Sequence, residues 1–302
     1  ACSSGSRGDC QPFAALALGL KRAGFDTMVF TNPDHEKLVT DLGVQFRSNQ
    51  LPFVDFFQSE KLAEKFSKND FLGYLDALGA HNHEYGAKMY TAYYHLLQSY
   101  KPDLVIAGTN QWPDALWIPI LCKIPPMFIN LSNSHTIDPD KAPFGLPSLG
   151  PGMNRPVWMQ CVDAWVDGLN KSYGKTLAGL SGKPIDEFFP TGHDVAGLFG
   201  GIQPDEFDFL PYLIAQDVDF VGTKPTDLPR FKYTGDLILP AEACRGKEFG
   251  GAKTDALASF IDSCPAPPIY IGWGSLICIS AKFMTTMAVR TLKLTGQKGI
   301  IL

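Results

Sequence analysis

The residues with the clearest potential for chemistry stand in one run near the start of the chain, Gly5-Ser6-Arg7-Gly8-Asp9. An amphipathic helix is predicted directly after this run. Four apolar residues repeat there at the spacing of a single helix face: Phe13, Leu16, Ala17 and Leu20. Pro12 is typical of the first turn of a helix, and Gly24 is typical of the position just after its C-terminal end.

A glycine-containing turn before a helix indicates an anion site. Glycine lets the backbone approach a ligand closely, and the unpaired amides of a helix N-terminus favour phosphate. We therefore expect Gly5, Ser6, Arg7 and Gly8 to lie against a phosphate group. Asp9 is a poor phosphate ligand because like charges repel, but it is well placed to act as a base. The structural alternative is that Asp9 only caps the helix. The G-x-G-x-x-G pattern of dinucleotide-binding proteins is absent from this run, which gives a nicotinamide cofactor little support.

Strands and helices alternate through the rest of the chain. The strands predicted before residue 140 are 27–31, 44–47, 103–108 and 126–131, with helices at 34–42, 59–67, 83–100 and 113–121. This rhythm indicates an α/β fold with a parallel, Rossmann-like sheet, in which ligands bind beyond the carboxyl ends of the strands. The loops 5–9, 108–112 and 131–136 should share that edge. Thr109, Trp112 and His135 are the candidate contacts at that edge for an acceptor, meaning a substrate that receives a transferred group. His135 could equally be a loop residue bonded to backbone.

A second, shorter unit of the same kind is predicted towards the end of the sequence. A Pro- and Gly-rich loop at 138–152 could act as a lid, and a helix over 155–180 carries an aromatic stripe that favours core packing. We expect a strand at 237–239 and a linker over 240–252 with a short helix near 253–262. A strand at 269–275, a helix capped by Ser280 and a final strand at 300–302 then open a second Rossmann-like domain.

Composition excludes several classes of protein. A net charge of −5 over 302 residues argues against nucleic-acid binding, and no apolar run is long enough to span a membrane. Seven cysteines without C-x-x-C spacing indicate free thiols in a reducing, cytoplasmic compartment. His81, His83 and Glu84 do not present a metal-ligand set, and the Asp-x-Asp triplets at 138–140 and 217–219 are expected by chance. No metal site is predicted.

Two segments resemble one family. Gly5–Pro12 with its following helix, and Tyr270-Ile-Gly-Trp-Gly-Ser275, are similar to segments of GT-B glycosyltransferases, in particular the sterol glucosyltransferases and glycopeptide aglycone glucosyltransferases. The resemblance implies that Asp9 is the general base and that Gly274 and Ser275 approach the phosphates of the sugar donor. It also implies an acceptor-binding domain at 1–239, a linker at 240–267 and, at 268–302, the truncated start of a nucleotide-sugar-binding domain.

The function implied by this resemblance is inverting, metal-independent transfer of a hexose, glucose by preference, from a UDP-sugar to a hydroxyl of a sterol or other lipophilic acceptor. It needs no cofactor and allows peripheral contact with membranes. Both ends of the chain look cut, and the family's second glycine-rich segment is missing, so we expect this piece alone to be inactive. The alternatives are a non-catalytic module that binds lipid or aglycone, and a related nucleotide-sugar enzyme such as an epimerase.

Overall fold

The computed structural model describes residues 1–68, 70–108, 114–131, 140–142, 146–182, 210–222, 231–244, 249, 253–274 and 280–302. The chain divides into two units. The first contains residues 1–51 and 83–238, and the second contains residues 52–82 and 239–302.

Parallel strands form the centre of the first unit. β1 (Met28–Thr31) pairs with β2 (Gln45–Ser48), and four further strands follow in the order β3-β4-β5-β6. Their bounds are Val105–Gly108, Pro126–Asn130, Tyr212–Ile214 and Phe231–Tyr233. Every pair in this series is parallel, as is required when helices connect successive strands.

The first three residues join these two groups of strands. Cys2 forms parallel bridges with both Phe30 in β1 and Ala107 in β3. The Cys2 amide donates to the Ile106 carbonyl (2.7 Å), and the Ser3 amide donates to the Phe30 carbonyl (3.1 Å). The N-terminal segment therefore acts as the strand between β1 and β3, directly before the Gly5 turn. The predicted α/β class with a parallel sheet is confirmed.

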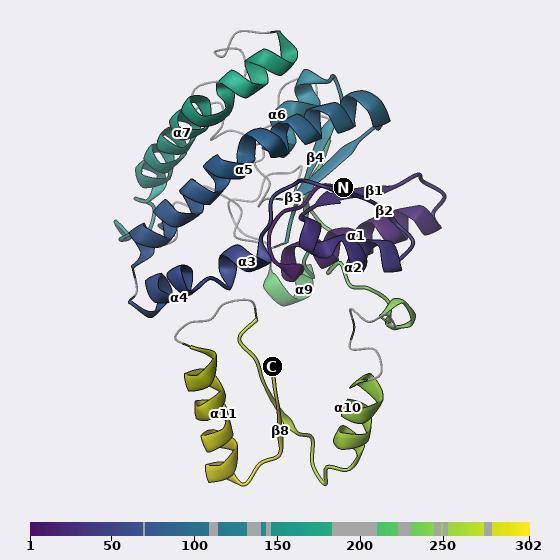
Figure 1. Cartoon of the computed structure of the whole chain (residues 1–302), viewed down its shortest axis with the longest axis vertical. Coiled ribbons are helices and arrows are strands. Elements are labelled where there is room, and N and C mark those ends of the chain that lie inside the picture. Colours follow the sequence, from purple (N-terminus) through teal and green to yellow (C-terminus); the bar gives the residue numbers. More distant parts are fainter. Residues whose placement is uncertain are drawn as a thin grey trace. The chain divides into compact units, whose positions relative to one another are not determined.

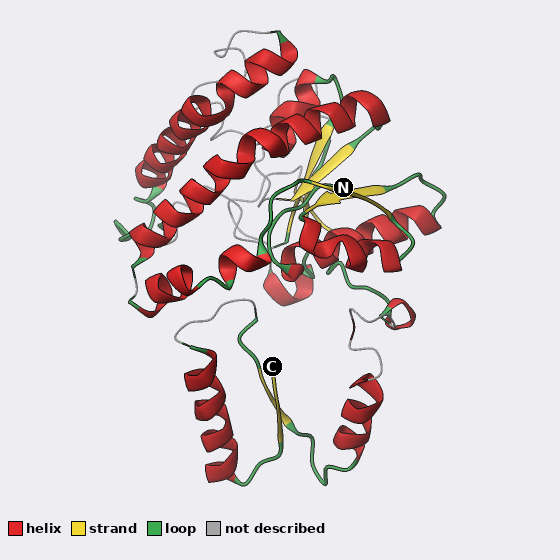
Figure 2. Cartoon of the chain, in the orientation of Figure 1, coloured by secondary structure: helices red, strands yellow, loops and turns green. Residues whose placement is uncertain are grey.

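Helices cover both faces of this sheet (Figures 1 and 2). They are α1 (Arg7–Arg22), α2 (Glu36–Asp41, after the 3-10 turn η1 at Pro33–His35), α5 (Phe71–Tyr100, of which residues 83–100 belong to this unit), α6 (Asp114–Leu121) and α7 (Arg155–Ser181). The short α9 (Val218–Val221) follows β5 and buries none of its residues. Side chains alternate between the two faces along each strand. In β5, for example, Tyr212 and Ile214 pack on one face, while Leu213 packs on the other.

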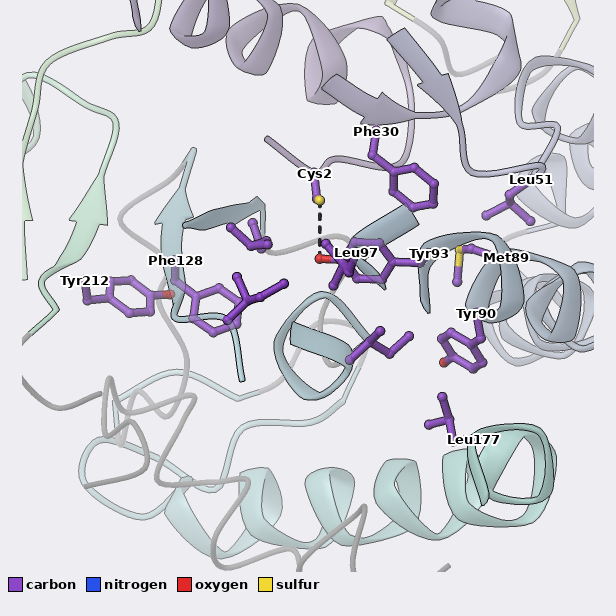
Figure 3. Close-up of a cluster of buried hydrophobic side chains, with 14 of the residues drawn as sticks. Cys2, Phe30, Leu51, Met89, Tyr90, Tyr93, Leu97, Phe128, Leu177 and Tyr212 are labelled. Atoms are coloured by element: carbon purple, nitrogen blue, oxygen red, sulfur yellow. Dashed lines mark hydrogen bonds between the residues drawn. The ribbon is translucent and has the colours of Figure 1, made fainter. Parts of the chain in front are cut away.

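The larger core lies under α5, α6 and α7 (Figure 3). Phe30 and Tyr93 stack with ring centroids 4.9 Å apart, and the Cys2 thiol donates to the Tyr93 hydroxyl (3.4 Å). Leu177 of α7 closes this core opposite Tyr90 of α5. These contacts tie the N-terminal segment to helices that lie far along the chain.

The opposite face of the sheet is covered by α1. Phe13 packs there with Ile106, Ile129 and Ala215. A Cβ atom on Gly108, at the end of β3, would lie 2.7 Å from Cζ of Phe13. Because real Cβ atoms do not approach other atoms so closely, Gly108 lets α1 pack directly against the sheet.

The second unit contains a strand–helix–strand, as predicted. β7 (Ile269–Ile271) pairs in parallel with β8 (Gly299–Ile301), and α11 (Ala281–Thr295) lies between them in sequence. The Ser280 hydroxyl accepts from the Phe283 amide (3.2 Å), and Gly296 ends α11 in the left-handed conformation. The unit also contains α3 (Val54–Phe57), α4 (Glu60–Ser67), the 3-10 turn η5 (Ala241–Ala243) and α10 (Lys253–Asp262).

Two predictions about elements were wrong. Residues 237–239 are not a strand: the last strand of the first unit is Phe231–Tyr233, and the chain leaves the sheet at Gly235, where φ is +77°. Ile238 is 74% exposed, so the apolar triplet misled the prediction. The helix expected at 83–100 begins at Phe71.

Candidate functional site

Buried polar side chains gather where the parallel strands of the first unit end. They are Ser3, Ser4, Thr31, Asn32, His35, Asn49 and Asn130. Each of these residues lies at or within four residues after the end of the N-terminal segment, β1, β2 or β4. The carboxyl ends of parallel strands meet at one edge, so these groups mark the edge where an open α/β sheet binds ligands.

Asp9 lies in the first turn of α1, which begins at this edge. Its Oδ2 atom accepts from the Ser6 amide (2.7 Å) and from the Ser6 hydroxyl (2.9 Å). The bond from the Ser6 amide is the arm of a capping box in which the third helical residue reaches back to the N-cap. The capping interpretation of Asp9 is thus realised. The carboxylate is nevertheless half-buried rather than sealed from solvent, and its orientation is fixed.

Gly5 lies directly beneath this carboxylate. Its φ of +134° is rarely adopted by residues with a side chain, and a Cβ atom there would lie 2.3 Å from Asp9 Oδ2. The Gly5 amide donates to Asn32 Oδ1 (2.8 Å), and the Gly5 carbonyl accepts from His35 Nε2 (3.0 Å). Glycine is therefore required at this position for both conformation and space.

These bonds bear on the predicted phosphate contacts. The amides of Gly5 and Ser6 already donate within the chain, to Asn32 and Asp9 respectively. Arg7 and Gly8 are exposed at the same turn, and Arg7 Nε donates to Gln11 Oε1 (2.9 Å). A ligand at this turn would therefore meet Arg7 and Gly8 first. That Gly5, Ser6, Arg7 and Gly8 bind phosphate stays a prediction.

The residues that hold Gly5 were not singled out by the sequence analysis. Asn32 is completely buried, and its amide nitrogen donates to the Leu51 carbonyl (2.7 Å). Asn49 supports the same corner, because its Oδ1 accepts from the Leu51 amide (2.9 Å). The available signal was position: Asn32 and Asn49 each follow directly on the last residue of a strand.

Cys10 does not offer a nucleophile at this site. Its side chain is fully buried, and burial raises the pKa of the thiol above its ordinary value, although hydrogen bonds with Thr31 and Ser3 act in the opposite direction. Cys2, Cys122, Cys244 and Cys264 are likewise free thiols. Asp9 is therefore the reactive group that the turn presents.

The structure does not test the remaining predicted site residues. Thr109, Trp112, His135 and Ser275 lie outside the described residues. Gly274 belongs to the second unit, where it follows β7 with a φ of +65°, a conformation that favours glycine. The roles predicted for these five residues stay predictions.

Two other residues from groups considered in the sequence, His81 and Asp217, have structural roles. His81 Nε2 donates to the Pro52 carbonyl (2.7 Å), and the His81 ring stacks on the Phe56 ring with centroids 4.2 Å apart. Asp217 caps α9 by accepting from the Asp219 amide (2.9 Å). In the part of the chain that the structure describes, no group of three His, Cys, Asp or Glu residues could hold a metal ion. No helix in that part is long and apolar enough to cross a membrane.

Neither a protein-family model nor a curated protein matches this sequence. Solved structures of glycosyltransferases are similar to it. One is SsfS6 of Streptomyces sp. SF2575 complexed with thymidine diphosphate, at 15% identity over 97% of this chain and 64% of that one, with a TM-score of 0.49. Another is CalG4, the calicheamicin glycosyltransferase, at 15% identity over 78% of this chain and 50% of that one, with a TM-score of 0.44.

A third similar structure is the glycosyltransferase VinC in complex with DTDP, at 14% identity over 90% of this chain and 58% of that one, with a TM-score of 0.39. The chain thus spans between 50% and 64% of the length of these three proteins. Because all three TM-scores lie below 0.5, the proposals that follow rest on the residues of this chain.

Proposed function

We propose that this chain belongs to a glycosyltransferase that moves a sugar from a nucleotide-sugar donor to an acceptor hydroxyl, with Asp9 as the general base. The observation that carries the proposal is the Asp9 carboxylate itself. It is half-buried, held by Ser6 at the start of α1, and lies at the ligand-binding edge of a parallel sheet. The resemblance of Gly5–Pro12 and Tyr270–Ser275 to GT-B glycosyltransferases supports the same function.

In the proposed reaction the acceptor oxygen attacks the anomeric carbon while Asp9 takes the hydroxyl proton. The bond between the anomeric carbon and the phosphate oxygen breaks, and the nucleoside diphosphate leaves with the bonding electrons, so the configuration at carbon inverts. One general base of this kind contributes about 10²–10⁴ in rate. Backbone amides at Gly274 and Ser275, and the helix N-termini, would stabilise the leaving phosphates without a metal ion.

The finer proposal concerns substrates. The resemblance favours a UDP-sugar, with glucose as the hexose, and a sterol or other lipophilic acceptor in a cytoplasmic protein that contacts membranes at their surface. No cofactor is required. Since this sequence lacks the second glycine-rich segment that the resemblance implies, the full-length protein that contains it is the species to assay, and the 302-residue chain alone should transfer no sugar.

The test compares Asp9→Asn with the wild type in the full-length protein. An Asn oxygen can still accept from the Ser6 amide and keep the cap, but an amide cannot take a proton at this step. We expect the transfer of labelled glucose to fall by about 10²–10⁴ while the donor KM changes little. UDP-glucose and its thymidine counterpart serve as donors, and sterols and polar aglycones serve as acceptors.

The matched control is Asp34→Asn, which neutralises an exposed carboxylate next to the same edge and should keep the wild-type rate. Full activity of Asp9→Asn would show that Asp9 is not the base. Sugar transfer by the 302-residue chain alone would contradict the expectation that the chain needs the rest of the protein.

A non-catalytic binding module is the second candidate, and the capping role of Asp9 favours it. In that case the protein would bind the nucleotide sugar, and no acceptor would be glycosylated. Calorimetry with UDP-glucose on wild type and Asp9→Asn, alongside the transfer assay, separates the two functions.

A further inference from the structure

We propose that His35 is a positioning residue for Asp9. The proposal rests on the function proposed above, in which Asp9 is the base, and adds a residue from the turn η1, outside α1. The feature that carries it is a chain of two hydrogen bonds joined through a single peptide group.

That peptide group is the one between Gly5 and Ser6. Its carbonyl oxygen, which belongs to Gly5, accepts from His35 Nε2 at 3.0 Å. Its amide, which belongs to Ser6, donates to Asp9 Oδ2 at 2.7 Å. Because a carbonyl oxygen can only accept, Nε2 of His35 carries the hydrogen.

A peptide group is planar, so one hydrogen bond to its carbonyl fixes the direction of its N–H. The bond from His35 therefore orients the Ser6 amide towards the Asp9 carboxylate. A donor at the carbonyl also polarises the peptide and strengthens its N–H as a donor, since hydrogen bonds in a chain reinforce one another. His35 thus acts on Asp9 both by orientation and by polarisation.

The surroundings make this arrangement rigid. His35 is 6% exposed, and its own amide donates to the Asn32 carbonyl (3.1 Å), so it is anchored at the end of β1. Asn32 holds the Gly5 amide on the other side of the same residue (2.8 Å). Without His35 the Gly5 carbonyl would lose a buried partner, and the peptide could rotate away from Asp9.

The experiment uses His35→Leu and His35→Gln. Leucine keeps apolar bulk but has no donor, whereas the glutamine amide can place a donor near the position of Nε2. In the full-length protein we expect His35→Leu to lower kcat by about tenfold or more with little change in donor KM, and His35→Gln to restore most of it. Asp34→Asn, in the same turn, is the matched control. An unchanged kcat in His35→Leu would overturn the proposal.

A second measurement does not depend on activity. Hydrogen exchange of the Ser6 amide, followed by NMR, should become about tenfold faster in His35→Leu and stay near the wild-type rate in His35→Gln. The amides of Val29 and Ile106, in the strands beside the turn, report general destabilisation. If Ser6 exchange accelerates no more than theirs does, His35 is only structural and the proposal fails. If the wild type transfers no sugar, the proposed function fails, while Ser6 exchange still decides whether His35 positions Asp9.

Discussion

Single residues already show how strongly one contact can link the stability of this protein to pH. The Tyr100 hydroxyl, at the end of α5, donates to Asp26 Oδ2 (2.9 Å), while Asp26 Oδ1 accepts from Gln45 (2.6 Å). Burial first, and then the hydrogen bond and the negative charge of Asp26, raises the pKa of Tyr100 from 10.0 to about 12. The phenol is thus held in its neutral form.

This shift predicts a loss of stability in alkali. A pKa that is higher in the folded state gives stabilisation that is complete below pH 10 and disappears as pH rises through about 12. Tyr100→Phe removes the titrating group. Its free energy of unfolding should therefore approach that of the wild type between pH 10 and 12, as measured by urea unfolding at each pH.

Tyr94→Phe, on the same helix, controls for the loss of a hydroxyl. A difference between Tyr100→Phe and wild type that stays constant from pH 8 to pH 12 would contradict this account of Tyr100.

Some single residues of the candidate site can be predicted from the sequence, and others cannot. Gly5 and Asp9 could be singled out because glycine, carboxylate and helix start are adjacent in the chain. Position after a strand could have marked Asn32 as a candidate, but the roles of Asn32 and His35 depend on the N-terminal segment lying beside β1. That neighbourhood is a property of the sheet order, and local spacing carries no information about it.

At the scale of elements, the stability of α1 should depend on the glycine that precedes it, Gly5, and not on the glycine in its interior, Gly19. Gly5→Ala would bring a Cβ atom to 2.3 Å from Asp9 Oδ2 in a backbone conformation with φ +134°. The Asp9 side chain would have to leave its cap. We expect a loss of about 1–3 kcal/mol in the free energy of unfolding, measured by urea denaturation.

Gly19→Ala is the matched control on the same helix. Gly19 is exposed in the interior of α1, and a Cβ atom there would meet nothing within 4 Å. Alanine should stabilise α1 by about 0.5–1 kcal/mol. Equal effects of the two substitutions would show that α1 responds to helix propensity alone and that the contact under Asp9 is unimportant.

Elements with regular patterns were predicted well, and those without them were not. The apolar runs of β3 and β4, and the cap and final glycine of α11, fix those elements locally. β6 was misplaced because Leu237-Ile-Leu239 is the more apolar triplet, whereas Phe231–Tyr233 is the one that reaches β5. Pairing with a neighbour, and not hydrophobicity, decided which triplet became the strand.

At the scale of the whole molecule, the two units should differ in local stability. Among the described strands, those of the first unit are joined into one sheet that has buried cores on both faces, whereas β7 and β8 pair only with each other. Ile269 and Tyr270 of β7 are exposed. Two-stranded ladders with exposed side chains open more readily.

Hydrogen exchange with mass spectrometry tests this difference. Peptides covering β7 and β8 should exchange at least about tenfold faster than peptides covering β3 and β4. Equal protection in both units of the 302-residue chain would mean that they unfold together as one cooperative body.

Composition and motifs predicted two Rossmann-like regions, but not which residues belong to each compact unit. Residues 52–82 group with 239–302, although they lie between β2 and the buried part of α5 in the sequence. Nothing in their local pattern indicates that grouping. The domain ranges 1–239, 240–267 and 268–302 stay a prediction.

The place of the N-terminal segment has a consequence for how the protein is made. Residues 1–3 leave the ribosome before both of the strands that they join, because Cys2 bridges Phe30 on one side and Ala107 on the other. This segment must therefore remain unpaired along one edge until more than a hundred residues have been synthesised. Since the Gly5 turn continues directly from it, the sheet edge at which Asp9 lies is complete only after β3 has emerged.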